Sequence, residues 1–457
     1  MRRAFPQLQQ VRPHLAGGTP PVARRETGGN PVSAPGDGAT GECPFVDGLV
    51  PLSGPRFHTD PAALYRDMRR EHGAVVPVEL LGGVPAWLVI GYRELLRVTG
   101  DPELFSRDSG LWNRWDSIPP DWPLLPMIGR DQPSILYTVG SRHHRRARMI
   151  SDALEAVDPI ELSRHTEQLA DALVDGFCQK GETDLIPAYA MLLPMLVLTR
   201  LYGFPDGEGP GLARALNNII DGGENALAGQ RHLAGSMHRL VTSRRTRPVN
   251  DVVSRMLAHQ PQEFTDEEIL QDLMVMTAAG HQPTADWIGN SVRLMLTDDR
   301  FAASLAAGRN STGEAMNEVL WEDTPTQNVA GRWASRDAQL AGRHISAGDM
   351  LLLGLAAANG DPSVHAGAGA GAGPHNGLRG GNHAFFSFGH GEHRCPFPAQ
   401  EIAEIIARTG IEVLLDRLPD IDLSVPVASL ARRPSPWLRG MAALPVRFTP
   451  TPARGGM

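Results

Sequence analysis

A cysteine stands on a glycine-rich turn directly before a helix-forming segment, in the stretch FFSFGHGEHRCPFPAQEIAEIIA, residues 385–407. Gly389 and Gly391 lack a Cβ, so the backbone there can adopt left-handed conformations and approach a planar ligand closely. Pro398 suits the first turn of a helix, and the isoleucines after it recur at helical spacing. Cys395 therefore precedes a helix N-terminus, whose dipole favours the thiolate. The pattern predicts a thiolate offered to a metal.

This loop resembles the haem-binding signature of the cytochrome P450 superfamily, Phe-Gly-x-Gly-x-His-x-Cys. The matching residues are Phe388, Gly389, Gly391, His393 and Cys395. The resemblance implies that the chain binds haem b, that the Cys395 thiolate is the ligand of the iron, and that the other matching residues lie against the cofactor. A thiolate ligand pushes electron density through the iron and favours O–O cleavage.

Two other interpretations of this cysteine stay open. One is a buried structural cysteine on an ordinary turn. The other is a zinc site in which His383, His390 and His393 join Cys395, since imidazole and thiolate are common zinc ligands. The chain has three cysteines, too few and too scattered for a disulfide framework, and this usage fits a reducing compartment.

Composition sets the expected organisation of the chain. Residues 1–42 are rich in Gly, Pro, Ala and Arg without periodicity, so we predict a disordered leader there and a single domain over residues 43–457. No apolar run reaches the roughly eighteen residues that span a bilayer, so we expect a cytoplasmic protein without membrane attachment. The net charge of −8 argues against a nucleic-acid partner.

Helical patterns dominate the chain, with a small amount of sheet. Residues 60–73 and residues 92–105 predict helices, and residues 74–91 between them predict a β-hairpin that turns at Gly82 and Gly83. The expected fold class is therefore mainly α. The resemblance implies the cytochrome P450 fold, a triangular helical domain with a small β-rich region.

An irregular stretch follows over residues 106–137, with no helical or strand period. It contains Trp112, Trp115 and Trp122. Long irregular loops usually carry function or disorder. The tryptophans either line a pocket or pack the loop, and the sequence leaves both interpretations open.

The segment SRHHRRARMISDAL begins a helix in which His144 and Arg148 are four residues apart and share one face. In the family a His-x-x-x-Arg pair here hydrogen-bonds a haem propionate. Arg332 matches a further propionate ligand and His393 another. Arginine suits this work because its planar fork binds carboxylates with two hydrogen bonds. The alternative interpretation is an ordinary solvated basic face.

A long helix is predicted from Thr265 to Leu296, and its start carries a capping box formed by Thr265 and Glu268. In the family this is the central helix that crosses the haem face, with the consensus Ala-Gly-x-Glu/Asp-Thr. The chain reads Ala279, Gly280, His281, Gln282 and Pro283 at these positions. The first half of the consensus matches and the second half does not.

The mismatch affects proton delivery, which the acid and the threonine of the family organise. Gln282 cannot ionise, and Pro283 has neither a hydroxyl nor an N–H. Proline also removes the hydrogen bond to the carbonyl of Ala279 and kinks the helix. Thr284 supplies a hydroxyl one position late, and His281 is a group whose ordinary pKa lies near neutrality. We expect Gly280, His281, Gln282 and Thr284 to form an atypical catalytic site.

A second departure concerns the Glu-x-x-Arg motif of the family, a buried ion pair near the haem. Glu318 is present, but Trp321 takes the place of the arginine and cannot neutralise a carboxylate. Arg379 is one candidate partner for Glu318, and an ordinary surface helix is the alternative. An actinobacterial branch of the superfamily lacks this arginine, and the chain resembles that branch.

The resemblance implies a haem-thiolate monooxygenase of secondary metabolism. It would insert one oxygen atom from O2 into a small apolar substrate, with electrons from NAD(P)H passed through ferredoxin reductase and ferredoxin. Ferredoxin would dock near Cys395, where Arg394 provides positive charge. We expect a monomer. The alternatives are a peroxide-driven haem-thiolate enzyme and a haem-binding regulatory protein whose catalysis has lapsed.

Overall fold

The computed structural model describes residues 48–129, 133–205, 207–221, 225–259, 263–299, 301, 311–365 and 382–455. The chain separates into two compact units, Met1–Cys43 and Pro44–Met457, and every described residue belongs to the second. The predicted leader lies outside the described residues, so the division into leader and single domain stays a prediction. Among the described helices none is both long and apolar enough to cross a membrane.

A six-stranded mixed sheet forms one part of the second unit, with the strand order β1-β2-β3-β9-β6-β4. Its strands are β1 Val50–Pro51, β2 Val75–Leu80, β3 Val84–Val89, β4 Phe105–Ser106, β6 Val329–Ala334 and β9 Met350–Leu353. β2 and β3 form the predicted hairpin, and Gly82 and Gly83 turn it with φ values of +86° and +77°. Smaller sheets join β5 Glu182–Asp184, β10 Asp422–Leu423 and β11 Pro445–Arg447, and β7 Ala338–Leu340 with β8 Arg343–Ile345.

Helices make up most of the remainder. They are α1 Pro55–Thr59, α2 Pro61–His72, α3 Tyr92–Gly100, α4 Leu125–Ile128, α5 Gly140–Glu155, α6 Pro159–Asp175, α7 Leu192–Tyr202, α8 Gly209–Asp221, α9 Ala226–Thr246, α10 Val252–Ala258, α11 Asp266–Thr297, α13 Ser311–Glu322, α14 Leu355–Asn359, α15 Pro362–His365 and α16 Ala399–Arg417. The mainly α class is confirmed. The helix predicted over residues 92–105 was too long, because it ends at Gly100 and Phe105 pairs with β6 instead.

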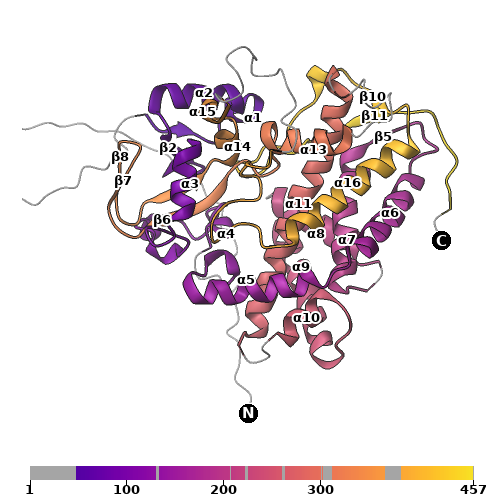
Figure 1. Ribbon diagram of the computed structural model, residues 1–457, viewed down its shortest axis with the longest axis horizontal. Coiled ribbons are helices and arrows are strands. Elements are labelled where there is room, and N and C mark those ends of the chain that lie inside the picture. The colour runs from indigo at the N-terminus through magenta and orange to yellow at the C-terminus, as the bar shows by residue number, and fades with distance from the viewer. Residues whose placement is uncertain are drawn as a thin grey trace, which may run out of the picture. The chain divides into compact units, whose positions relative to one another are not determined.

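The helix α11 organises the helical part and contacts α7, α9, α13 and α16. It begins at the predicted capping box, in which Thr265 accepts from the Glu268 N–H and Glu268 accepts from the Thr265 N–H. Pro283 lies inside it. Figure 1 shows α11 running beside α16 and α13, with β2, α2 and α3 grouped at the other side of the view.

The tryptophans of the irregular loop pack the core. Trp112 and Trp122 are buried in the hydrophobic cluster beneath the sheet, and Trp115 packs against it. The Trp122 indole N–H donates to the carbonyl of Leu81 at 2.6 Å, which ties the loop to the hairpin. The pocket interpretation is therefore replaced by the packing interpretation.

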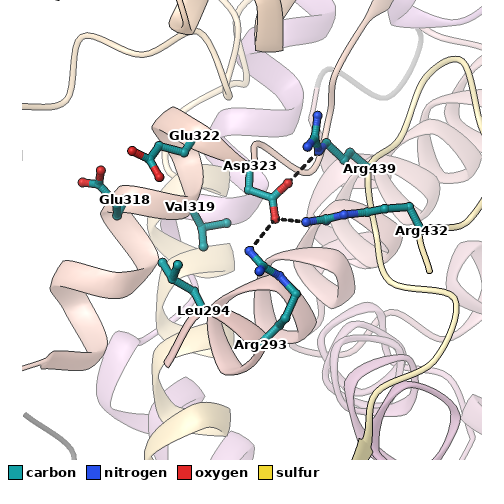
Figure 2. Close-up of a pocket in the computed structure, with 8 residues that line it drawn as sticks. All are labelled: Arg293, Leu294, Glu318, Val319, Glu322, Asp323, Arg432 and Arg439. Atoms are coloured by element: carbon teal, nitrogen blue, oxygen red, sulfur yellow. Dashed lines mark hydrogen bonds and ion pairs between the residues drawn. The ribbon is translucent and has the colours of Figure 1, made fainter. Parts of the chain in front are cut away.

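Near the end of α13, Asp323 lies among three arginines. It accepts hydrogen bonds from Arg293 of α11 at 3.1 Å and from Arg439 at 2.6 Å, and it also pairs with Arg432. Figure 2 shows these side chains converging on the Asp323 carboxylate. The network joins α11, α13 and the C-terminal segment.

Two residues before Asp323, Trp321 is buried, and its indole N–H donates to the carbonyl of Asn382 at 3.0 Å. The indole edge also meets the ring of Phe385, with 5.8 Å between the ring centroids. Trp321 therefore braces the segment that leads into the cysteine loop by packing and by the hydrogen bond to Asn382. Glu318 is buried as well, and its candidate partner Arg379 lies outside the described residues.

Candidate functional site

A cavity of about 510 Å³ separates the cysteine loop from the middle of α11. Cys395, Phe388 and Gly389 line it from the loop, and Ala279, Gly280 and Thr284 line it from the helix. Two segments that are more than a hundred residues apart in the sequence thus face each other across one space. This is the arrangement that the resemblance implies for the cofactor.

The loop is held by backbone hydrogen bonds and by two glycines in the left-handed region. The N–H of Cys395 donates to Phe388 at 2.8 Å, and Gly389 has a φ of +74°. Gly391 has a φ of +75°, and a Cβ there would lie 2.1 Å from the carbonyl oxygen of Thr99. Gly391 does not line the cavity, so its glycine is required by the close approach to α3 and not by a ligand.

Burial raises the pKa of the Cys395 thiol to about 11. Burial therefore outweighs the expected preference for the thiolate, and α16 begins four residues after Cys395, at Ala399. A metal cation bound to the sulfur would remove the proton directly. The zinc alternative fails on geometry: within the described part of the chain, the group with ligand atoms close enough to share a metal is His143, Glu392 and His393, which excludes Cys395.

The helix α5 presents a different face to the cavity from the one that its sequence predicts. His143 and Ala147 line the cavity. His144 and Arg148 are exposed, and the His144 ring lies 3.9 Å from the Glu392 carboxylate. The predicted propionate pair is therefore wrong by one residue in register.

The rotation of α5 follows from a buried ion pair. Arg146 is fully buried and its Nε donates to the Asp272 carboxylate of α11 at 2.8 Å. Arg146 also contacts the Glu268 carboxylate at 3.5 Å. A buried guanidinium needs a carboxylate partner. The pairing of Arg146 with α11 therefore sets the orientation of α5, and His143, three residues earlier, lies at the cavity. Asp272 lies one helical turn after Glu268 on α11, and this pair of acids was the sequence signal for the contact.

Two arginines make one end of the cavity cationic. Arg107 and Arg332 line this end together with His143 and His393, and burial lowers the pKa of both histidines, so their rings are neutral. The His143 and His393 rings lie 3.8 Å apart, and the buried His393 Nε2 has no hydrogen-bond partner. Burial lowers the pKa of the Arg332 guanidinium, and the nearby charge of Arg107 lowers it further. Arg332 and His393, which the resemblance assigns to the cofactor carboxylates, thus line the same cavity as Arg107, which the sequence analysis does not name.

On α11 the predicted catalytic residues separate into two groups. Gly280 and Thr284 line the cavity, but His281 and Gln282 do not. The His281 Nε2 lies 2.7 Å from the carbonyl oxygen of Met191, and burial lowers the pKa of His281 to about 4. His281 is therefore neutral near pH 7 and faces away from the site, which corrects the expectation that it titrates there.

Comparison with solved structures covers most of the chain. The structure resembles CYP154C4 from Streptomyces sp. W2061, with a TM-score of 0.76 and 26% sequence identity over 88% of this chain and 98% of that one. CYP154A1 from Streptomyces coelicolor A3(2) also gives a TM-score of 0.76, at 25% identity. It covers 88% of this chain and 100% of that one. The chain has the cytochrome P450 fold.

Sequence comparison agrees with this cytochrome P450 fold. The cytochrome P450 monooxygenase PikC of Streptomyces venezuelae is 28% identical over 420 residues, which cover 90% of this chain and 96% of the relative. No protein-family model matches the chain. The relatives and the solved structures support an oxygenase of the cytochrome P450 superfamily, of actinobacterial type, with haem b as its cofactor.

The cavity of this cytochrome P450 fold suits haem b in two ways. Cys395 and Gly389 face the small residues Ala279 and Gly280, which leaves room for a flat macrocycle. The cationic end with the unpartnered His393 nitrogen suits the carboxylates of the cofactor. Cys395 would hold the iron, and Arg332, His143 and His393 would hold the carboxylates.

Asp286 is a buried acid behind the cavity wall that the sequence analysis missed. It accepts a hydrogen bond from the Gln282 amide at 2.8 Å, one helical turn away. Burial raises the pKa of Asp286 to about 7. The i, i+4 spacing of Gln282 and Asp286 was the available signal.

This raised pKa predicts a pH-dependent stability. Unfolding releases a proton from Asp286 above its ordinary pKa of 3.8, so its contribution to stability is full below about pH 4 and declines as the pH rises through about 7. The variant Asp286→Asn cannot ionise. We measure the free energy of unfolding of this variant and of the parent in urea at each pH. We expect the difference, variant minus parent, to be more favourable to the variant at pH 8 than at pH 5. An equal difference at both values would contradict the assignment.

Proposed function

We propose that this haem-thiolate monooxygenase acts on a small apolar substrate with electrons delivered by ferredoxin. The observation that carries the proposal is that Cys395 and the small residues Ala279 and Gly280 line opposite sides of one cavity. Haem b bound at Cys395 supplies the iron chemistry that activates oxygen. The protein supplies binding, orientation and protons.

The walls of the cavity support an apolar substrate. Leu198, Leu201, Val275 and Met276 contribute to the lining. These side chains select a substrate by shape and apolar contact. A cavity of about 510 Å³ that also houses the cofactor favours a small molecule.

Proton delivery is proposed to centre on Thr284. Thr284 belongs to the cavity lining, and Pro283 next to it leaves the carbonyl of Ala279 without its usual helical donor. A hydroxyl and a freed carbonyl can together order water at the site. Gln282 and Asp286 form the polar pair behind this wall, with Asp286 as the ionisable member.

A peroxide-driven reaction is the second candidate. It is favoured by Gln282, which occupies the position of the family's acid but points to Asp286 and does not line the cavity. Hydrogen peroxide brings both oxygen atoms and protons, so it does not depend on that acid.

Electron delivery is proposed to occur on the face next to Cys395. Arg394 is exposed there, and Phe397 is 53% exposed although it is a large apolar side chain. The exposed His144 and Arg148 on α5 add further basic groups. An apolar contact with surrounding positive charge suits an acidic partner such as a ferredoxin.

The variant Thr284→Val tests the proton route. With ferredoxin, its reductase and NADPH, we expect product formation per NADPH to fall at least about tenfold, since a positioned proton donor typically contributes ~10²–10⁴ in rate. Peroxide-fed turnover should change little. Product is measured by mass spectrometry across a panel of small apolar compounds.

Thr277→Val is the matched control, because Thr277 is buried on the same helix and its hydroxyl donates to Leu273 at 2.7 Å. It should leave coupling unchanged. Tight coupling in Thr284→Val would contradict the proposed route. Turnover with peroxide but none with ferredoxin, its reductase and NADPH would support the second candidate. Haem binding without any turnover would contradict both and favour a regulatory protein.

A further inference from the structure

Two buried guanidinium groups share the cationic end of the cavity. Arg107 is 3% exposed and Arg332 is 4% exposed. Within the described ranges, no salt bridge joins either arginine to a carboxylate; the Tyr137 phenol lies near Arg107, and Glu392 is close enough to influence Arg332 electrostatically. Buried charges are normally paired, so two guanidinium groups without a carboxylate partner favour an anionic ligand in the cavity.

Strand register places Arg107 beside Arg332. β4 pairs antiparallel with β6, with Phe105 opposite Ala334 and Ser106 opposite Trp333. Arg107 follows directly and lies next to Arg332 of β6. The Nη1 atom of Arg107 donates to the carbonyls of Ala330 at 2.5 Å and Gly331 at 2.9 Å, and its Nε donates to Leu136 at 2.9 Å. The guanidinium is therefore fixed in place.

The helix α5 has no cation at the position where the His-x-x-x-Arg motif of the family has its arginine. His143 lines the cavity, and four residues later, on the same face, the lining residue is Ala147. At the cavity, His143 thus takes the histidine position of the His-x-x-x-Arg motif, and Ala147 takes the position of its arginine. The arginines nearby are directed elsewhere: Arg146 pairs with Asp272, and Arg148 is exposed.

We propose that Arg107 is the second fixed cation for the haem carboxylates and takes over from the arginine that is absent at Ala147. Haem b carries two propionate groups, and Arg107 with Arg332 supplies two guanidinium groups for them. Arginine is always charged and binds carboxylates with directed hydrogen bonds. This inference rests on the proposed haem-binding function and adds a residue that the helix motif does not contain.

The test compares Arg107→Gln with Arg148→Gln in the haem-loaded protein, because both variants remove one arginine. Haem release is followed by transfer to apomyoglobin, and the ferric/ferrous potential by spectroelectrochemistry. For Arg107→Gln we expect release at least about tenfold faster, the equivalent of about 1.4 kcal/mol, and a lower potential, since loss of a nearby positive charge favours the more positive ferric state. Arg148→Gln should match the parent in both measurements.

A rescue variant separates charge from structure, because Arg107 also bonds three backbone carbonyls. Adding Ala147→Arg to Arg107→Gln should restore haem retention and the potential, although the carbonyl bonds remain lost. An Arg107→Gln protein with the haem release and potential of the parent would overturn the inference, as would failure of Ala147→Arg to restore either. A parent protein that binds no haem would instead overturn the proposed function.

Discussion

Replacing Cys395 with serine is expected to abolish the long-wavelength Soret band of the reduced, carbon-monoxide-bound protein. That band requires an intact thiolate ligand, and serine offers an alcohol oxygen that remains protonated and binds iron weakly. Among the cysteines that the structure describes, Cys395 is the one that lines the cavity. The measurement is one absorption spectrum, with total haem determined separately so that loss of the ligand is distinguished from loss of the cofactor.

Cys178→Ser is the matched control for this experiment. Cys178 is a free, buried cysteine in the helical core, where its sulfur lies 3.9 Å from a nitrogen of Arg417. It does not line the cavity, so its replacement should leave the band in place. A band that survives in Cys395→Ser would remove the basis for the haem-thiolate assignment.

Replacing Asp323 with asparagine is expected to lower the free energy of unfolding by about 3 kcal/mol, since removal of one partner from a buried ionic network strands the others. Asp323 is 5% exposed, and its loss leaves Arg293, Arg432 and Arg439 without their shared carboxylate. Figure 2 shows that the three guanidinium groups meet at this side chain. Urea unfolding of the haem-loaded protein measures the change.

The same network predicts how stability varies with pH. The surrounding arginines hold the pKa of the Asp323 carboxyl well below its ordinary value of 3.8. Its contribution is therefore present above about pH 4 and is lost progressively as the pH falls below that value. The destabilisation caused by Asp323→Asn should be full at pH 7 and shrink in acid.

Asp422→Asn serves as the control, because Asp422 forms an exposed ion pair with Arg447 at 2.8 Å. Exposed pairs contribute roughly 0–1 kcal/mol, so this variant should unfold almost as the parent does. An equally small effect at Asp323 would show that the arginines find other partners. The network would then contribute little to holding α11, α13 and the C-terminal segment together.

Local patterns were sufficient for the elements whose cause is local. The capping box at Thr265, the hairpin at Gly82 and Gly83, and the cysteine loop each depend on residues close together in the sequence. Steric freedom of glycine and hydrogen bonds between neighbours act within a few positions. For this reason the fold class, the start of α11 and the placement of Cys395 at the cavity follow from the sequence.

Tertiary contacts decided the rest of the site. The sequence has two adjacent histidines, and only the pairing of Arg146 with Asp272 turns His143 rather than His144 to the cavity. Likewise Arg107 enters the site because β4 pairs with β6, more than two hundred residues later. A helix can rotate by one residue at little local cost, so its orientation is chosen by the buried charges that it must satisfy.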